Sequence, residues 1–154
     1  MKTNRLARVA LLLWVVTVAV LVWFFLRSLA VADTDARAAI RLHPAERQMV
    51  LSEMRGLLVA TQGILEGASR GDRLRIMAAA HAGGMASMSS ADPALMAKLP
   101  LEYKALNMDV HHDMDEIANA AEAGRTTAQL LQMTSDTITK CNACHAAWRL
   151  GASR

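Results

Sequence analysis

The hydrophobic pattern of this chain changes once, from a continuous apolar run to a helical periodicity. Residues 9–26 read VALLLWVVTVAVLVWFFL, with one threonine and no charged residue. At about 1.5 Å per residue, a helix over this run reaches roughly 27 Å, enough to cross a thin hydrocarbon core. After residue 43, apolar residues recur at spacings of three and four, as on the buried face of a helix. The pattern predicts one N-terminal membrane helix followed by a helical domain.

Local signals divide that domain into helices. We expect helices over residues 44–68, 73–88, 101–123 and 127–150, and a loop with a short helical turn over residues 89–100. Pro44 suits a first helical position, and Asp72 and Thr126 suit N-caps. Gly83-Gly84 favours a kink or a close approach of another group. Helices with short connections pack most simply as an antiparallel bundle, so the expected fold class is all-α, an antiparallel four-helix bundle after one transmembrane helix.

The charges that flank the apolar run predict its topology. Lys2, Arg5 and Arg8 precede the run, so the N-terminus is expected in the cytoplasm. The competing interpretation is a cleavable signal peptide, because Ala30-Val31-Ala32 has the A-x-A pattern of a cleavage site. An uncleaved anchor is favoured, since signal apolar regions span about 7–15 residues and Arg27 follows this run.

The expected organisation is a cytoplasmic segment, a transmembrane anchor (or uncleaved signal), a juxtamembrane linker and an exported domain, over residues 1–8, 9–26, 27–43 and 44–154. Both interpretations export the domain. We therefore expect a single-pass protein of the bacterial inner membrane with its C-terminal domain in the periplasm.

Composition narrows the function classes. The formal net charge of the 154 residues is +3, and several of the positive charges lie at the N-terminus. No Lys/Arg stripe typical of nucleic-acid binding is present. The sequence also lacks a G-x-S-x-G, a phosphate-binding glycine loop and an H-E-x-x-H motif. Nucleic-acid binding and nucleophilic or acid–base catalysis are therefore not expected, and the protein is not expected to be an enzyme.

The only two cysteines form a C-x-x-C-H motif, Cys141-Asn142-Ala143-Cys144-His145. This motif is typical of covalent haem attachment, in which two thiols add to the haem vinyl groups and the histidine binds the iron. A disulfide, a thioredoxin-like redox pair and half of a zinc site are the alternatives. A zinc site needs further ligands at matching spacing, and a redox pair is expected near a βαβ unit. The motif predicts one covalently bound haem c with His145 as axial ligand.

These residues resemble a known family. The segment CNACHAAWR is similar to the C-x-x-C-H-x-x-Tyr-Arg motif of class II c-type cytochromes, the cytochrome c′ family, with Trp148 in place of tyrosine. The segment EMRGLLVATQGI resembles the family's Met-Lys…Gly-Ala-Ile run and places Met54 at the distal haem face. The resemblance covers residues 44–150. It implies a membrane-anchored four-helix bundle that carries a covalent haem, and members often dimerise through their first two helices.

The distal side of the haem decides between two kinds of chemistry. If the thioether of Met54 binds the iron, Met/His ligation favours a raised potential and electron transfer. A register shift of three residues places Leu51 there instead, and in this family an apolar distal residue accompanies binding of nitric oxide or carbon monoxide. Methionines at helical spacing are also common in cores. Both alternatives remain open at this stage.

Further residues are expected near the haem. Arg149 is expected to pair with a haem propionate or a helix C-terminal carbonyl, and Trp148 to lie against the macrocycle or close the bundle end. Leu51 and Leu57 are further expected haem contacts. Lys140 fits a positive rim that would steer an acidic redox partner. For His111 and His112, solvated or half-buried polar residues are favoured over a haem contact or a weak metal site.

The sequence thus predicts a periplasmic, membrane-tethered monohaem c-type cytochrome that carries single electrons between membrane or periplasmic redox proteins. The alternatives are a five-coordinate haem protein that binds nitric oxide or carbon monoxide, and a small cytochrome subunit of a membrane oxidoreductase. Tethering would raise the effective concentration of partners.

Overall fold

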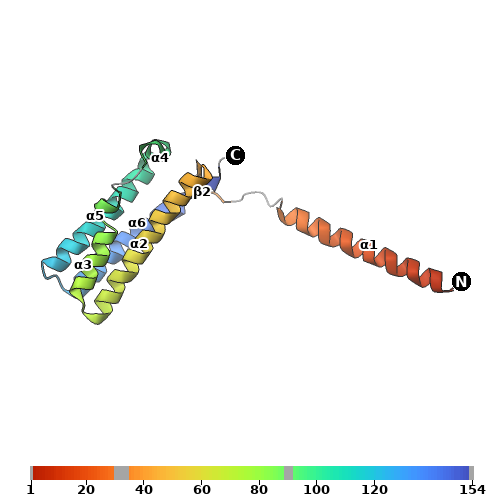
Figure 1. Ribbon diagram of the computed structural model, residues 1–154, viewed down its shortest axis with the longest axis horizontal. Coiled ribbons are helices and arrows are strands. Elements are labelled where there is room, and N and C mark those ends of the chain that lie inside the picture. Colours follow the sequence, from red (N-terminus) through yellow and green to blue (C-terminus); the bar gives the residue numbers. More distant parts are fainter. Residues whose placement is uncertain (1, 30–34, 89–91, 153–154) are drawn as a thin grey trace. The chain divides into compact units, whose positions relative to one another are not determined.

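The computed structural model describes residues 2–29, 35–88 and 92–152, and the chain divides into two units (Figure 1). The first unit spans Met1–Ala36 and the second Arg37–Arg154. Six α-helices in the described residues make the protein mostly helical. The expected cleavage pattern Ala30-Val31-Ala32 lies outside the described residues.

Helix α1 (Lys2–Leu29) contains the predicted apolar run. Its segment Asn4–Arg27 has a mean hydropathy of 2.8, so by length and composition it is able to span a membrane. A signal sequence near an N-terminus meets the same criterion. The coarse prediction of one apolar N-terminal helix is therefore confirmed.

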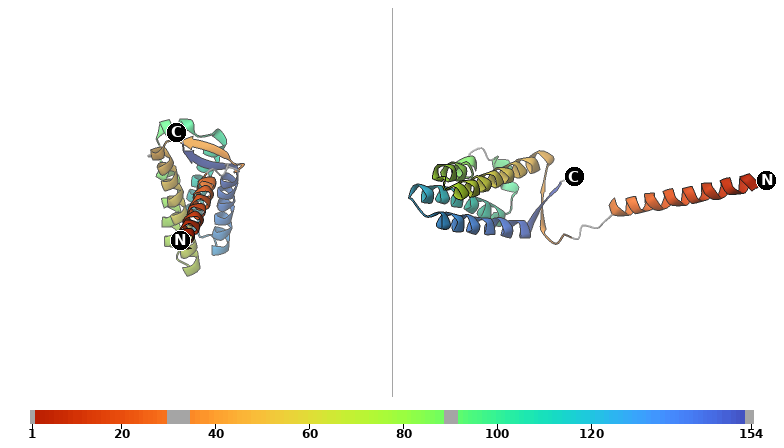
Figure 2. Two further views of the ribbon diagram at one scale, coloured as in Figure 1. Left: turned by 90° about the vertical axis from the view of Figure 1, so that its right-hand side faces the viewer. Right: turned by 90° about the horizontal axis from the view of Figure 1, so that it is seen from below.

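The second unit is built around four helices that lie side by side (Figure 2). These are α2 (Pro44–Arg70), α3 (Arg73–Ala82), α5 (Leu101–Glu122) and α6 (Thr127–Ala147). Helix α2 packs against α3, α3 against α5, α5 against α6, and α6 against α2. A 3₁₀ turn, η1 (Met85–Met88), and a short helix, α4 (Pro93–Lys98), connect α3 to α5.

The predicted helix starts are confirmed by their capping contacts. Pro44 occupies the first turn of α2. The Asp72 side chain accepts a hydrogen bond from the backbone N–H of Arg75, and Thr126 accepts one from that of Gln129. The predicted helix over residues 73–88 is wrong in its second half, because α3 ends at Ala82 and Gly83 caps it. The glycine pair ends the helix instead of kinking it.

The fourth helix also ends earlier than predicted, at Ala147. The residues that follow form strand β2 (Trp148–Ala152), which pairs in parallel with strand β1 (Ala38–Leu42), so that Ile40 lies opposite Leu150. Ile40 and Leu42 are buried, and this burial favours the extended pairing over another helical turn. The all-α prediction therefore missed a small sheet, and residues 38–42 of the predicted linker belong to the second unit.

Two apolar cores stabilise this unit. The larger core joins the four long helices through residues such as Ile64, Ile76, Met114, Ile117 and Leu130. The smaller core gathers where β1, α4 and the start of α5 meet α2, and consists of Ile40, Leu42, Val50, Leu95, Leu99 and Tyr103. Met54, Cys144 and Trp148 pack against the smaller core, so it supports residues of the C-x-x-C-H region.

Two glycines of α2 provide a matched test of this packing. A Cβ on Gly67 would lie 2.8 Å from Cγ1 of Ile76 and 2.9 Å from the backbone oxygen of Asp72, whereas a Cβ on Gly56 meets nothing within 4 Å. We expect Gly67→Ala to lower the free energy of unfolding by about 1–3 kcal/mol through overpacking. Gly56→Ala should raise it by about 0.5–1 kcal/mol through helix propensity. Urea denaturation followed by circular dichroism measures both, and equal effects would contradict the packing.

Candidate functional site

One cavity gathers most of the residues that the sequence singled out. This cavity, called here the motif cavity, has a volume of about 280 Å³. Its lining comes from α2, α5, α6, β2 and the residue before β1, and consists of Arg37, Arg47, Leu51, Met54, Tyr103, Cys144, His145, Trp148, Arg149 and Leu150. The fold therefore brings Leu51 and Met54 of α2 to Cys144 and His145 of α6, about 90 positions later in the sequence.

Two of the predicted site residues lie elsewhere. Leu57 lines a different cavity and packs against the larger core. Cys141 is half-buried on α6 one helical turn before Cys144 and is not part of the motif cavity's lining. Trp148 and Arg149 do line it, but from β2 and not from α6 as predicted. Strand pairing with β1 thus carries both side chains out of the helix.

Both cysteines are free thiols. Burial raises the pKa of each, with a further contribution from the charge of Asp113 at Cys141 and from the charge of Cys141 at Cys144. Both thiols therefore stay mainly protonated at neutral pH. Among the described residues, no three His, Cys, Asp or Glu side chains gather as a metal site, so the motif lacks the further ligands of a zinc centre there.

Tyr103 and Trp148 close one side of the motif cavity. Their rings meet edge to face, with centroids 6.0 Å apart and planes at 84°. Burial, together with the nearby charges of Cys144 and Glu53, raises the pKa of the Tyr103 hydroxyl. Tyr103 is buried in the smaller core, and no local pattern singles it out, because only the fold brings the start of α5 to Trp148 of β2.

Three arginines line the motif cavity: Arg37, Arg47 and Arg149. The Nη1 atom of Arg37 donates a 3.1 Å hydrogen bond to the backbone oxygen of His145, a carbonyl near the C-terminal end of α6. Guanidinium groups suit carboxylates, such as haem propionates, through paired hydrogen bonds. Lys140, the predicted positive rim, is bound to Asp113 at 2.7 Å, which offsets its charge locally.

These residues fit a c-type haem in their chemistry. The motif supplies two protonated thiols on successive turns of α6, and His145 has an exposed imidazole at the motif cavity. On the α2 side, the cavity offers both the thioether of Met54 and the side chain of Leu51. Both candidate distal residues therefore remain available.

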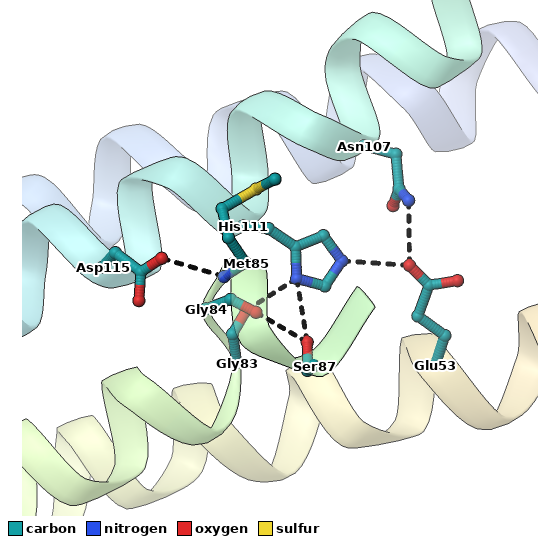
Figure 3. Close-up of polar contacts among 8 residues, drawn as sticks. All are labelled: Glu53, Gly83, Gly84, Met85, Ser87, Asn107, His111 and Asp115. Atoms are coloured by element: carbon teal, nitrogen blue, oxygen red, sulfur yellow. Dashed lines mark hydrogen bonds and ion pairs between the residues drawn. The ribbon is translucent and has the colours of Figure 1, made fainter. Parts of the chain in front are cut away.

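A second polar group lies away from the motif cavity and is centred on His111 (Figure 3). The imidazole is 1% exposed, and its Nδ1 lies 2.7 Å from the backbone oxygen of Gly83. Its Nε2 lies 3.0 Å from Oε1 of Glu53, which also accepts a 2.8 Å hydrogen bond from Asn107. His111 is thus more buried than predicted, whereas His112 is exposed.

Electrostatics favour an ion pair between these two residues. Burial lowers the pKa of His111, but hydrogen bonds to Glu53 and Gly83 and the charge of Glu53 raise it overall. Burial raises the pKa of Glu53, but hydrogen bonds from His111 and Asn107 and the charge of His111 lower it overall. Because a carbonyl and a carboxylate only accept, these two contacts favour the imidazolium form of His111, in which both ring nitrogens donate.

Comparisons of the chain with protein-family models, with curated proteins and with solved structures found no match.

Proposed function

We propose that this chain is a membrane-tethered, periplasmic monohaem c-type cytochrome that works as a one-electron carrier. The observation that carries the proposal is the C-x-x-C-H motif at the end of α6, whose Cys144 and His145 share a cavity with Met54. Cys141 and Cys144 would hold the haem covalently, and His145 would bind its iron. The haem would supply reversible one-electron chemistry, and the four packed helices would form the antiparallel bundle that surrounds it.

The protein's own residues support this assignment in three ways. The half-buried thioether of Met54 packs on the smaller core and faces the same cavity as His145. Arg37, Arg47 and Arg149 offer cations for carboxylate groups at the cavity. Tyr103 and Trp148 provide an aromatic wall on one side of the cavity. Helix α1 would tether the domain beside membrane donors or acceptors and raise their effective concentration.

A second function is favoured by a specific observation, because Leu51 lines the motif cavity beside Met54. If Leu51 occupies the distal side, the iron is five-coordinate and the protein binds nitric oxide or carbon monoxide. The two functions differ in one measurable property. A Met/His haem leaves no iron position for an added gas, whereas an apolar distal side leaves one open.

The test is the visible spectrum of the purified full chain, oxidised and dithionite-reduced, with and without carbon monoxide. Sharp reduced bands that do not respond to the gas indicate Met/His ligation and electron transfer. A broad reduced spectrum that sharpens with the gas indicates the gas-binding function. A chain expressed with an intact haem-attachment system that contains no covalent haem overturns both.

Replacing Met54 tests the distal assignment directly. We expect Met54→Leu to retain covalent haem but to bind carbon monoxide, because the sixth iron ligand is removed while the side-chain volume is nearly kept. The matched control is Met49→Leu, on the same helix but outside the motif cavity, which should leave the spectrum unchanged. A Met54→Leu chain with an unaltered spectrum would show that Met54 is only packing.

A further inference from the structure

A second cavity, called here the glutamate cavity, lies beside the His111 group and is distinct in its lining from the motif cavity. Its volume is about 410 Å³, which falls in the range of small-molecule sites. Its apolar walls include Met49, Val50, Leu57, Leu95, Met96 and Leu99. Glu53, Asn107 and His111 supply polar groups to the same cavity. A largely apolar space with a few convergent polar groups is the usual form of a ligand site.

The hydrogen bonds within this cavity leave an acceptor for a ligand. Oε1 of Glu53 accepts from both His111 and Asn107, and Figure 3 shows the second carboxylate oxygen turned away from these donors. Within the described residues, no hydrogen bond reaches that second oxygen, Oε2. The Glu53 side chain is 35% exposed, so a ligand is able to reach it. His111 uses both ring N–H groups on Gly83 and Glu53. Oε2 of Glu53 is therefore open to a hydrogen-bond donor from the ligand.

The charges of the cavity favour a neutral ligand. The imidazolium of His111 already balances the carboxylate of Glu53 at 3.0 Å. A cationic ligand would bring a second positive charge beside this compensated pair and would lose its hydration in doing so. The other carboxylate in the lining, Asp92, is exposed and accepts a hydrogen bond from the backbone of Ala94 at the start of α4.

The apolar walls favour an aromatic ligand. Three methionines, Met49, Met88 and Met96, line the cavity. Thioether sulfur makes favourable contacts with aromatic rings, and unbranched methionine side chains adapt their shape to a flat ring. An alkyl chain would gain burial here but would not gain these sulfur contacts.

We propose that the glutamate cavity binds a neutral phenolic compound, a phenol or hydroquinone, whose ring lies among the methionines and whose hydroxyl donates to Oε2 of Glu53. This site is separate from the haem assignment and stands without it. A ring of this kind reaches the protein either from the membrane, as a hydroquinone with an apolar tail, or from solution, as a small phenol.

The experiment uses the full chain in detergent micelles, reduced and without oxygen, with ¹³C-labelled methionine methyl groups. Phenol is the probe, and anisole is the matched probe, because it keeps the ring but lacks the hydroxyl donor. Phenol should shift the methyl signals of Met49 and Met96 but not that of Met108, which is on α5 outside the cavity. It should bind about ten-fold or more tightly than anisole, since a hydrogen bond to a charged acceptor is worth that much.

Two glutamate variants test whether Glu53 accepts the hydrogen bond from the phenol hydroxyl. In Glu53→Gln the single amide oxygen takes the bonds from His111 and Asn107, so an NH2 donor replaces Oε2 and the preference for phenol over anisole should disappear. Glu66→Gln, on the same helix but outside the cavity, should keep the full preference. Equal binding of phenol and anisole by the unmodified chain, or an equal loss in both variants, overturns the proposal. The first comparison needs no variant and holds even if Glu53→Gln does not fold.

The source of the ligand is distinguished by a third probe, a hydroquinone with a ten-carbon tail dissolved in the same micelles. If it shifts Met49 and Met96 at a lower total concentration than phenol, the site takes a membrane hydroquinone. If phenol shifts them and the tailed compound does not, the site takes a soluble phenol. If neither shifts them, no phenolic ligand binds there.

Discussion

We expect a chain in which Cys141 and Cys144 are both replaced by serine to carry no covalent haem. Serine keeps nearly the same volume and the helical position, but its hydroxyl does not add to a haem vinyl group as a thiol does. Each attachment forms one carbon–sulfur bond, and the thiol hydrogen goes to the neighbouring vinyl carbon. The measurement is the intact mass of the denatured protein, together with a haem stain after denaturing electrophoresis.

The single variants sharpen this result. Cys141→Ser and Cys144→Ser should each retain at most one thioether bond, so that less haem survives denaturation and its reduced spectrum shifts. The matched control is Ser135→Cys, which adds a thiol on an exposed position of α6 and should attach no second haem. Haem mass that persists in the double variant would show that the motif is not the attachment site. Because both thiols are only half-buried, replacing them with serine should disturb the packing little. Far-ultraviolet circular dichroism of the variants should therefore still show a helical protein.

The sequence predicts those features of this fold that depend on neighbouring residues. Pro44, Asp72 and Thr126 act on their own first turns, and each helix begins where its cap predicts. The parallel pairing of Ala38–Leu42 with Trp148–Ala152 joins the two ends of the second unit, and no local sequence pattern predicts this pairing. That pairing ends α6 early and moves Trp148 and Arg149 onto a strand.

The residues of the candidate site also divide into those with a local sequence signal and those placed by contacts between distant segments. The C-x-x-C-H motif is a local signal, and Cys144 and His145 line the motif cavity together. The local pattern places Arg37 in a linker and gives no signal at Tyr103, because both residues reach the cavity only through contacts between distant segments. The pair of Glu53 and His111 likewise connects α2 to α5. From the sequence alone, nothing distinguishes His111, which is buried, from His112, which is exposed.

The pair of Glu53 and His111 should make a large contribution to stability. We expect His111→Ala to lower the free energy of unfolding by about 2–4 kcal/mol, because it leaves the Glu53 carboxylate and the Gly83 carbonyl without their donor and opens a void. His112→Ala is the matched control, since His112 is the next residue of α5 but is exposed. It should change the free energy by no more than about 0.5 kcal/mol.

The same pair gives this stability a pH dependence with a definite sign. The pKa of His111 is raised in the folded state, so its stabilisation is full below the ordinary value of 6.5 and is lost as pH rises through the folded pKa. The pKa of Glu53 is lowered, so its stabilisation is full above the ordinary value of 4.5 and is lost as pH falls through the folded pKa. The pair therefore stabilises the fold most between pH 4.5 and 6.5.

Urea denaturation of the full chain at several pH values measures this dependence. The difference in unfolding free energy between the unmodified chain and His111→Ala should be largest near the middle of that window and should shrink as pH rises above it. His112→Ala should follow the unmodified chain at every pH. If the difference stays constant with pH, His111 stabilises the fold by packing and by its bond to Gly83 alone.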